Sequence, residues 1–353
     1  MRASAAICLL SVVLLGFAGC SQHSKIPQLP HQAKLFSDAV KPVDYRLQRF
    51  SIDSSGQAYG AAGNKLYRID SINDNLVELY EFDASILGFH ITSNNVFIIS
   101  TDNNHWNENV PCNIYASKSG GKKFARIKTI NGGCPVWMSI SSDQDYIYIG
   151  EYGPKDPYLS KNVWKYDPDT GKWDTVFQAP LESEAHIHRV GVDPYTNYLW
   201  VTVGDTRKNR GAFLSRDQGK SWVEVLDTQA TGVAFSAEKI YWGEDKKDYG
   251  GVFSTDSQGR RPVTVFNTKD FGNYAGSIYE LVALPDDTLL VPVMKYADSS
   301  NVASLWYSDT EQWELLIIFE SLPGQGKDTS SIAGPDKNGF VLLTGYKINW
   351  HQL

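Results

Sequence analysis

The chain has 353 residues, a formal net charge of −7 and an aromatic content of 12%, with 10 tryptophans and 19 tyrosines. An acidic chain lacks the basic surface that general nucleic-acid binding needs, so we expect no nucleic-acid partner. Its length is ample for a large hydrophobic core. The aromatic content favours β-structure and supplies side chains on which sugars can stack.

Residues 1–19 have the pattern of an export signal. Arg2 provides a basic start, and the apolar run from Ala3 to Phe17 has the length of a signal-peptide core, too short to span a bilayer comfortably. The run ends in Phe17-Ala18-Gly19-Cys20, which resembles a lipobox. The resemblance implies cleavage before Cys20 and a lipid, such as palmitate, on that cysteine. The alternative is an ordinary secretory signal that leaves Cys20 as a free thiol.

The segment after the signal predicts a lipid-anchored protein of the cell envelope. Ser21 follows the cysteine in place of the aspartate that marks inner-membrane retention, so the resemblance favours the outer membrane, facing the periplasm. Residues 20–42 are polar and contain three prolines, which indicates a tether. Residues 43–353 are expected to form one domain, because no break in composition indicates a second, and the protein is expected to be a monomer. No later apolar run reaches the ~18 residues of a membrane helix. Cleavage removes Arg2 and no acid, so the net charge goes from −7 to −8.

The four cysteines predict one disulfide. Cys8 leaves with the signal and Cys20 takes the lipid, so Cys112 and Cys134 remain as a pair in an oxidising compartment. Neither has a second ligand at zinc-like spacing, which argues against a zinc site.

A strand repeat fills the rest of the chain. Short runs of alternating or β-branched residues are separated by turns that contain Gly, Asp or Ser, and helical periodicity is hard to find. Each unit has a first strand, a very apolar second strand and a hairpin of third and fourth strands. The clearest second strands are 96–101, 146–150, 198–203, 239–242, 288–293 and 339–344. Their spacing of roughly 40 to 55 residues predicts an all-β fold, a single β-propeller of seven blades, with six as the alternative. The unit from Ser330 onward is short of strands, and a strand near residues 35–40 would complete it and close the ring.

One turn of this repeat carries a family motif. Residues 215–222, SRDQGKSW, match S-x-D-x-G-x-[ST]-W at every defined position and therefore resemble the Asp box, or BNR repeat, of one class of β-propellers. Asp217 is expected to accept N–H groups of the turn, Gly219 to supply a positive φ, and Trp222 to fill the space between blades. Decayed copies stand at the equivalent places 117–121 with Phe124, 167–171 with Trp173, 254–259, and 308–309 with Trp313. The motif predicts the fold and a structural role for Asp217, not catalysis.

Polar residues at the ends of apolar strands predict a site at the mouth of the central channel. The predicted catalytic residues are His186, His188, Tyr152, Arg189, Glu151 and Asp205. The predicted substrate-binding residues are Arg207, Arg210, Trp242, Tyr296 and His90. The arginines offer bidentate recognition of a carboxylate.

Two chemistries fit the histidine pair. His186 and His188 are two apart on one strand, so both face one side. With Glu151 or Asp205 they could bind a divalent metal. With Tyr152 they could instead form an acid–base pair. The structural alternative is that they hydrogen-bond neighbouring blades.

Residues from about 85 to 260 resemble sialidase-like BNR propellers encoded among bacterial exopolysaccharide genes. The resemblance is carried by the stretch from His186, HIHRVGVDPYTNYLWVTVGD, by the box after it and by the later YWGED. The resemblance implies a polysaccharide partner. The chain has no F-R-I-P motif near the start of the domain and no convincing triad of arginines in the blades where sialidases carry it, so it is not expected to be a true sialidase. One function is therefore binding or acting on an acidic polysaccharide, as a polysaccharide lyase or a glycoside hydrolase-like enzyme. The alternative is a non-catalytic propeller that serves as a scaffold for protein assembly in the envelope.

Overall fold

The computed structural model describes residues 34–35, 37–43, 47–102, 111–131, 133–153, 161–179, 186–204, 210–246, 250–269, 276–294, 302–308, 312–320 and 331–353. The predicted signal (1–19), Cys20, Asp205, Arg207 and Tyr296 lie outside these residues. Within them, no helix is long and apolar enough to cross a membrane.

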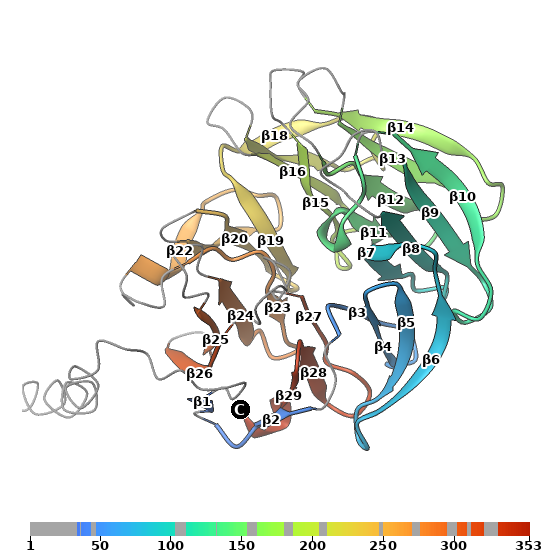
Figure 1. Ribbon diagram of the computed structural model, residues 1–353. Helices are drawn as coiled ribbons and strands as arrows, with labels where there is room; N and C mark the ends of the chain where they lie inside the picture. The colour runs from blue at the N-terminus through green and yellow to red at the C-terminus, as the bar shows by residue number, and fades with distance from the viewer. Residues whose placement is uncertain are drawn as a thin grey trace, which may run out of the picture. The chain divides into compact units, whose positions relative to one another are not determined.

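The strands form seven antiparallel sheets arranged as the blades of a β-propeller, which confirms the predicted fold class and the count of seven (Figure 1). The first three blades are β3–β6 (Arg49–Ile52, Ala58–Ala62, Lys65–Asp70, Asn75–Glu81), β7–β10 (Ser85–Ile91, Phe97–Asp102, Cys112–Ser117, Ala125–Ile130) and β11–β14 (Ile140–Ser142, Ile147–Gly150, Asn162–Tyr166, Trp173–Gln178). The next three are β15–β18 (His186–Val192, Leu199–Gly204, Gly211–Ser215, Val223–Leu226), β19–β22 (Ala230–Phe235, Lys239–Glu244, Gly251–Asp256, Val263–Asn267) and β23–β26 (Val282–Ala283, Leu289–Met294, Val302–Ser308, Trp313–Glu320).

Both ends of the domain meet in the seventh blade. It consists of β27 (Ile332–Ala333), β28 (Phe340–Leu343), β29 (Tyr346–Asn349) and the early strand β2 (Val40–Pro42), which pairs with β29 (Figure 1). The predicted closure by an N-terminal strand is confirmed. A further strand, β1 (Lys34–Leu35), pairs with β26 of blade six. The chain from Lys34 onward therefore belongs to the propeller, although the sequence assigned residues 20–42 to a tether.

The first strand of each blade lies innermost, because first strands of successive blades contact one another, as β7 contacts β11, β11 contacts β15 and β15 contacts β19. Second strands are enclosed between blades, and every residue of β8 and β16 is buried. Burial on both faces explains why these strands appear in the sequence as continuous apolar runs. The hydrophobic core is consequently divided among the interfaces between neighbouring blades, such as the cluster that joins Val163 to Ile187 and Val201.

The disulfide between Cys112 and Cys134 is present, as predicted. It links the first residue of β9 to the connection that follows β10. That connection leads into a 3₁₀ turn, η1 (Trp137–Ser139), which contacts β7, β12 and β15. The bridge therefore anchors a segment that lies among the inner strands.

The turn between β17 and β18 has the contacts expected of the motif. Asp217 Oδ1 accepts Ser221 N at 2.8 Å and Ser215 Oγ at 2.8 Å, and its Oδ2 accepts Ser221 Oγ at 2.6 Å. Gly219 has a φ of 87°, a value open to glycine and strained for other residues. Both oxygens of the Asp217 carboxylate therefore accept hydrogen bonds from within the turn.

The tryptophan that follows this turn joins two blades. Trp222 Nε1 donates to the carbonyl of Val176 in blade three at 2.7 Å. The same contact recurs two blades further on, where Trp313 Nε1 donates to the carbonyl of Val265 at 2.9 Å. The repetition indicates that these tryptophans hold adjacent outer strands together.

Replacing Asp217 with alanine is expected to lower the melting temperature at neutral pH. Hydrogen bonds, first that of the Ser221 hydroxyl, lower the pKa of Asp217 to about 2 from 3.8. Because the folded-state pKa is depressed, the stabilisation is present above pH 3.8 and is lost as the pH falls through about 2. Thermal unfolding followed by circular dichroism should show the gap between wild type and variant closing over that range. Unchanged melting with lost ligand binding would contradict the structural role.

Candidate functional site

A β-bulge shapes the start of β15, where the predicted histidines lie. The ladder pairs Ile187 with Val203 and Arg189 with Thr202, so His188 is the extra residue. Bulges redirect side chains and are frequent beside functional sites. Gly204, opposite His186, makes room for the redirected ring, because a Cβ there would come within 2.5 Å of His188 Cε1.

Three predicted catalytic residues form a cluster of rings, which we call the Tyr152 cluster: Tyr152, His186 and His188. The ring centroids of Tyr152 and His186 are 4.2 Å apart, those of the two histidines 4.6 Å, and those of Tyr152 and His188 6.3 Å. His186 is 4% exposed and His188 1%. Tyr152 is only half-buried, so it is the member that solvent can reach.

Apolar side chains from separate blades pack against Tyr152. Met138 of η1 lies in a buried cluster with Tyr279 and Met294, and both Tyr152 and Trp137 pack against that cluster. Met294 ends β24 of blade six, whereas Tyr152 follows β12 of blade three. The Tyr152 cluster therefore faces the centre of the ring rather than one blade interface.

Glu151 makes its side-chain hydrogen bonds within its own blade, and its catalytic role stays a prediction. Its Oε2 accepts the backbone N of Asn162 at 2.8 Å and that residue's Nδ2 at 2.9 Å, while Oε1 accepts Trp164 Nε1 at 3.0 Å. Burial raises the pKa of this carboxyl, and these hydrogen bonds oppose the rise. Glu151 directly follows β12, and its carboxylate binds the start of β13. It therefore stabilises its own blade.

Arg189 extends from β15 toward blades five to seven. Its Nη1 lies 3.3 Å from Glu280 Oε1, and its Nη2 donates to the Val233 carbonyl at 3.5 Å. Glu280 Oε2 also accepts the backbone N of Ile332 in blade seven at 2.9 Å. Burial raises the pKa of Glu280, and attraction to Arg189 opposes the rise. Glu280 was missed in the sequence because it lies in an apolar run before β23 and has no motif around it.

Two predicted substrate-binding residues are placed away from the channel mouth. Trp242 is fully buried between blades and donates from Nε1 to Thr255 Oγ1 at 2.9 Å, so it cannot stack on a sugar. His90 is the sixth residue of β7 and contacts Ser142 Oγ at 2.9 Å, at the end of β11. It therefore lies toward the opposite end of the inner strands from His186. Burial lowers the pKa of His90 to about 4, which keeps it neutral.

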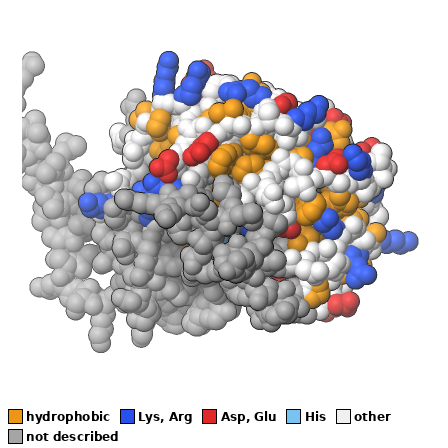
Figure 2. All heavy atoms as spheres, turned by 90° about the horizontal axis from the view of Figure 1, so that it is seen from above, with side chains coloured by type: hydrophobic (Ala, Val, Ile, Leu, Met, Phe, Trp, Pro, Cys, Tyr) orange, Lys and Arg blue, Asp and Glu red, His pale blue; other side chains and the backbone are white. Residues whose placement is uncertain are grey.

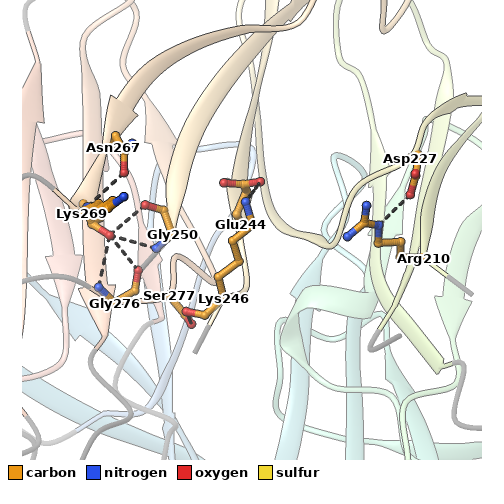
Figure 3. Close-up of polar contacts among 10 residues, drawn as sticks. Arg210, Asp227, Glu244, Lys246, Gly250, Asn267, Lys269, Gly276 and Ser277 are labelled. Carbon is orange, nitrogen blue, oxygen red and sulfur yellow. Dashed lines mark hydrogen bonds and ion pairs between the residues drawn. The ribbon is translucent and has the colours of Figure 1, made fainter. Parts of the chain in front are cut away.

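Arg210 lies at the entrance to β17 and is paired. Its Nε is 2.6 Å from Asp227 Oδ1, with 26% of the arginine side chain exposed. Figure 3 shows this pair apart from a second ion pair of Glu244 with Lys246, at 2.7 Å. A ligand would have to displace Asp227 to use the Arg210 edge that carries Nε.

The metal hypothesis gains no support in the form that uses Glu151, because that carboxylate accepts hydrogen bonds in its own blade. Among the described residues, no three His, Cys, Asp or Glu side chains gather so that they could hold a metal ion. The form that uses Asp205 stays a prediction, since that residue lies outside them.

Charged side chains are mixed on the surface that Figure 2 presents. Lys and Arg side chains are spread over the visible described part of this face, with Asp, Glu and hydrophobic side chains between them.

Comparisons with known proteins support the fold and leave the function open. No protein-family model matches the chain. Calmodulin-binding protein 60 B of Arabidopsis thaliana is 25% identical over 232 residues, which cover 63% of this chain and 29% of that protein. The chain therefore spans less than a third of the length of this curated relative.

Among solved structures, a GH74 enzyme of Niastella koreensis is similar with a TM-score of 0.60 and 13% identity, over 80% of this chain and 47% of the enzyme. A chain in the crystal structure of a mitotic checkpoint complex is similar with a TM-score of 0.55 and 10% identity, over 92% of this chain and 96% of the other. At such identities the likeness shows the fold alone.

Proposed function

We propose that the protein is an exported, lipid-anchored propeller of the Asp-box class that binds and cleaves an acidic polysaccharide in the cell envelope. The observation that carries this proposal is the Tyr152 cluster, in which a half-buried phenol lies 4.2 Å, centroid to centroid, from one of two buried imidazoles. Such a set supplies proton donors and acceptors together with a ring on which a sugar can stack. The motif at residues 215–222 and the lipobox-like Cys20 support the class and the anchor. The disulfide supports export, because such bonds persist in oxidising compartments.

Elimination fits these residues better than hydrolysis. Most glycoside hydrolases need two carboxyl groups beside the scissile bond. In the described part of the site, Glu151 is occupied in its blade and Glu280 is paired with Arg189. A lyase instead removes the proton next to a uronate carboxylate, after which the bond to the leaving sugar oxygen breaks and a carbon–carbon double bond forms. The base takes that proton, and the leaving oxygen receives one from an acid.

We assign Tyr152 to the removal of the proton next to the uronate carboxylate. The two histidines are its positioning neighbours. The test is incubation of the purified protein with pectate, alginate and hyaluronan, following the ultraviolet absorbance of the unsaturated product. Tyr152→Phe keeps the ring and removes the hydroxyl, so kcat is expected to fall at least about 100-fold. Tyr195→Phe is the matched control, because Tyr195 is 58% exposed and lies in the turn after β15, away from the cluster.

Two results would count against the proposed enzyme. One is the absence of product from every uronate polymer. The other is a Tyr152→Phe variant as active as the Tyr195→Phe control.

A scaffold for protein assembly is the second candidate. The observation that favours it is that both described carboxylates of the site are already bound within the protein, Glu151 to Asn162 and Glu280 to Arg189. If no uronate polymer is bound or cleaved, this candidate becomes the better account of the protein.

A further inference from the structure

Hydrogen-bond donors without protein partners lie near the centre of the ring. Arg189 Nε and Trp137 Nε1 are both buried, and neither has a hydrogen-bond partner among the described residues. Burying a donor without a partner is unfavourable, so two such donors in one region indicate that a group outside the protein binds there.

The two donors belong to one part of the molecule. Trp137 is in η1, which contacts β15, the strand of Arg189. Trp137 also packs against the cluster that contains Tyr279, the neighbour in sequence of the Arg189 partner Glu280. The guanidinium of Arg49 lies over the Trp137 ring, 3.8 Å from its centroid, and brings a second positive charge to the same place.

The free edge of Arg189 has the shape of a carboxylate site. Glu280 takes Nη1, and Nη2 has only a long contact of 3.5 Å to the Val233 carbonyl. The remaining edge presents Nε and Nη2 as two parallel donors, which is the arrangement that binds both oxygens of a planar carboxylate. Glu280 nearby would repel a doubly charged phosphate or sulfate more strongly than a singly charged carboxylate.

We propose that the Nε–Nη2 edge of Arg189, with Trp137 Nε1 as a further donor, binds one carboxylate group at the centre of the propeller. The group belongs either to a uronate unit or to a free organic acid. The uronate source rests on the proposed function, and the free-acid source does not. In either case the site recognises the ligand by its carboxylate, because the two groups without partners that we assign to it, Arg189 Nε and Trp137 Nε1, are both donors.

Isothermal titration calorimetry of the full exported protein with glucuronate, acetate and glucose tests this site. Glucuronate is expected to bind and glucose, which lacks the carboxylate, to bind at least ten-fold more weakly. Acetate binding as tightly as glucuronate would assign the site to free acids, and tighter glucuronate binding would assign it to uronates. Glucose binding as tightly as glucuronate would overturn the proposal.

Variants locate the binding. Arg189→Lys keeps the charge and removes the two-pronged edge, so glucuronate affinity is expected to fall at least about ten-fold. Trp137→Phe removes one N–H, and a loss of about five-fold is expected. Arg216→Met is the matched control, because Arg216 is an exposed cation bound to Gln258 at 2.7 Å on the β17–β18 turn. Unchanged affinity in folded Arg189→Lys and Trp137→Phe proteins would overturn the proposal.

The outcomes for this site and for the enzyme can be told apart. Glucuronate binding that Arg189→Lys weakens, without cleavage of any polymer, would support the carboxylate site and contradict the lyase. Cleavage of a polymer, with glucuronate affinity unaffected by Arg189→Lys and Trp137→Phe, would support the lyase and contradict the carboxylate site.

Discussion

Replacing Trp242 with alanine is expected to lower the free energy of unfolding by about 3–5 kcal/mol, the usual cost of removing a buried tryptophan. Trp242 is fully buried, and its ring meets Trp200 edge-on at 5.2 Å across the interface of blades four and five. The change leaves a large cavity and removes the donor to Thr255. Because the side chain never reaches the channel, saccharide binding by the folded variant should equal that of the wild type.

Urea unfolding and saccharide titration together check this prediction. Trp173→Ala provides the comparison, since Trp173 is half-buried at the start of β14 and its loss should cost less. A Trp242→Ala protein of normal stability with weakened saccharide binding would instead favour the role that the sequence suggested.

Removing the disulfide should have the second-largest effect on stability. Cys112 and Cys134 are 22 residues apart, and closing a loop of that length stabilises a fold by roughly 3 kcal/mol in the chain-entropy account. The double variant Cys112→Ala, Cys134→Ala is therefore expected to lose about 3 kcal/mol in the free energy of unfolding. Denaturant unfolding of the variant and of reduced wild type should agree with each other. Equal stability of the oxidised, reduced and variant proteins would show that the bridge contributes nothing.

Much of the fold could be predicted because its signals are local. The second strands are buried on both faces, so they appear as short apolar runs, and β16 follows its predicted range within one residue. The turn chemistry of Asp217 and Gly219 is also complete within eight residues. The shortage of strands at the end of the chain predicted a closing strand near residues 35–40, and the observed strand β2 begins at the last of these residues, Val40.

The candidate site was predictable only in part, since strand ends indicate position and not partners. Tyr152 and the two histidines do converge. Glu151 is a strand-end carboxylate like those of many sites, but the neighbouring strand satisfies it. Trp242 points into a blade interface because of the side-chain alternation along β20, which sequence alone does not fix.

The residues that sequence reasoning missed lie in connections. Trp137 is in a segment before β11 and Glu280 in one before β23, and neither stretch has periodicity or a motif. Their importance arises from Arg189, which belongs to a different blade. Contacts of this kind depend on how the ring closes, so no local sequence pattern could predict them.

The shared seventh blade has a consequence for the order in which the protein is assembled. Val40 pairs with Ile348, so one of the first residues of the domain cannot pair until one of the last has been made. Blades one to five are each made of consecutive strands and can form as the chain emerges, but the ring stays open until the residues of β29 have been made. Contacts between such distant residues form slowly, because a long loop must be ordered first. During that interval the early strand β2 lacks its partner β29, and an unpaired strand can pair with another chain. The pairing of β2 with β29 therefore removes an unpaired strand as well as completing the ring.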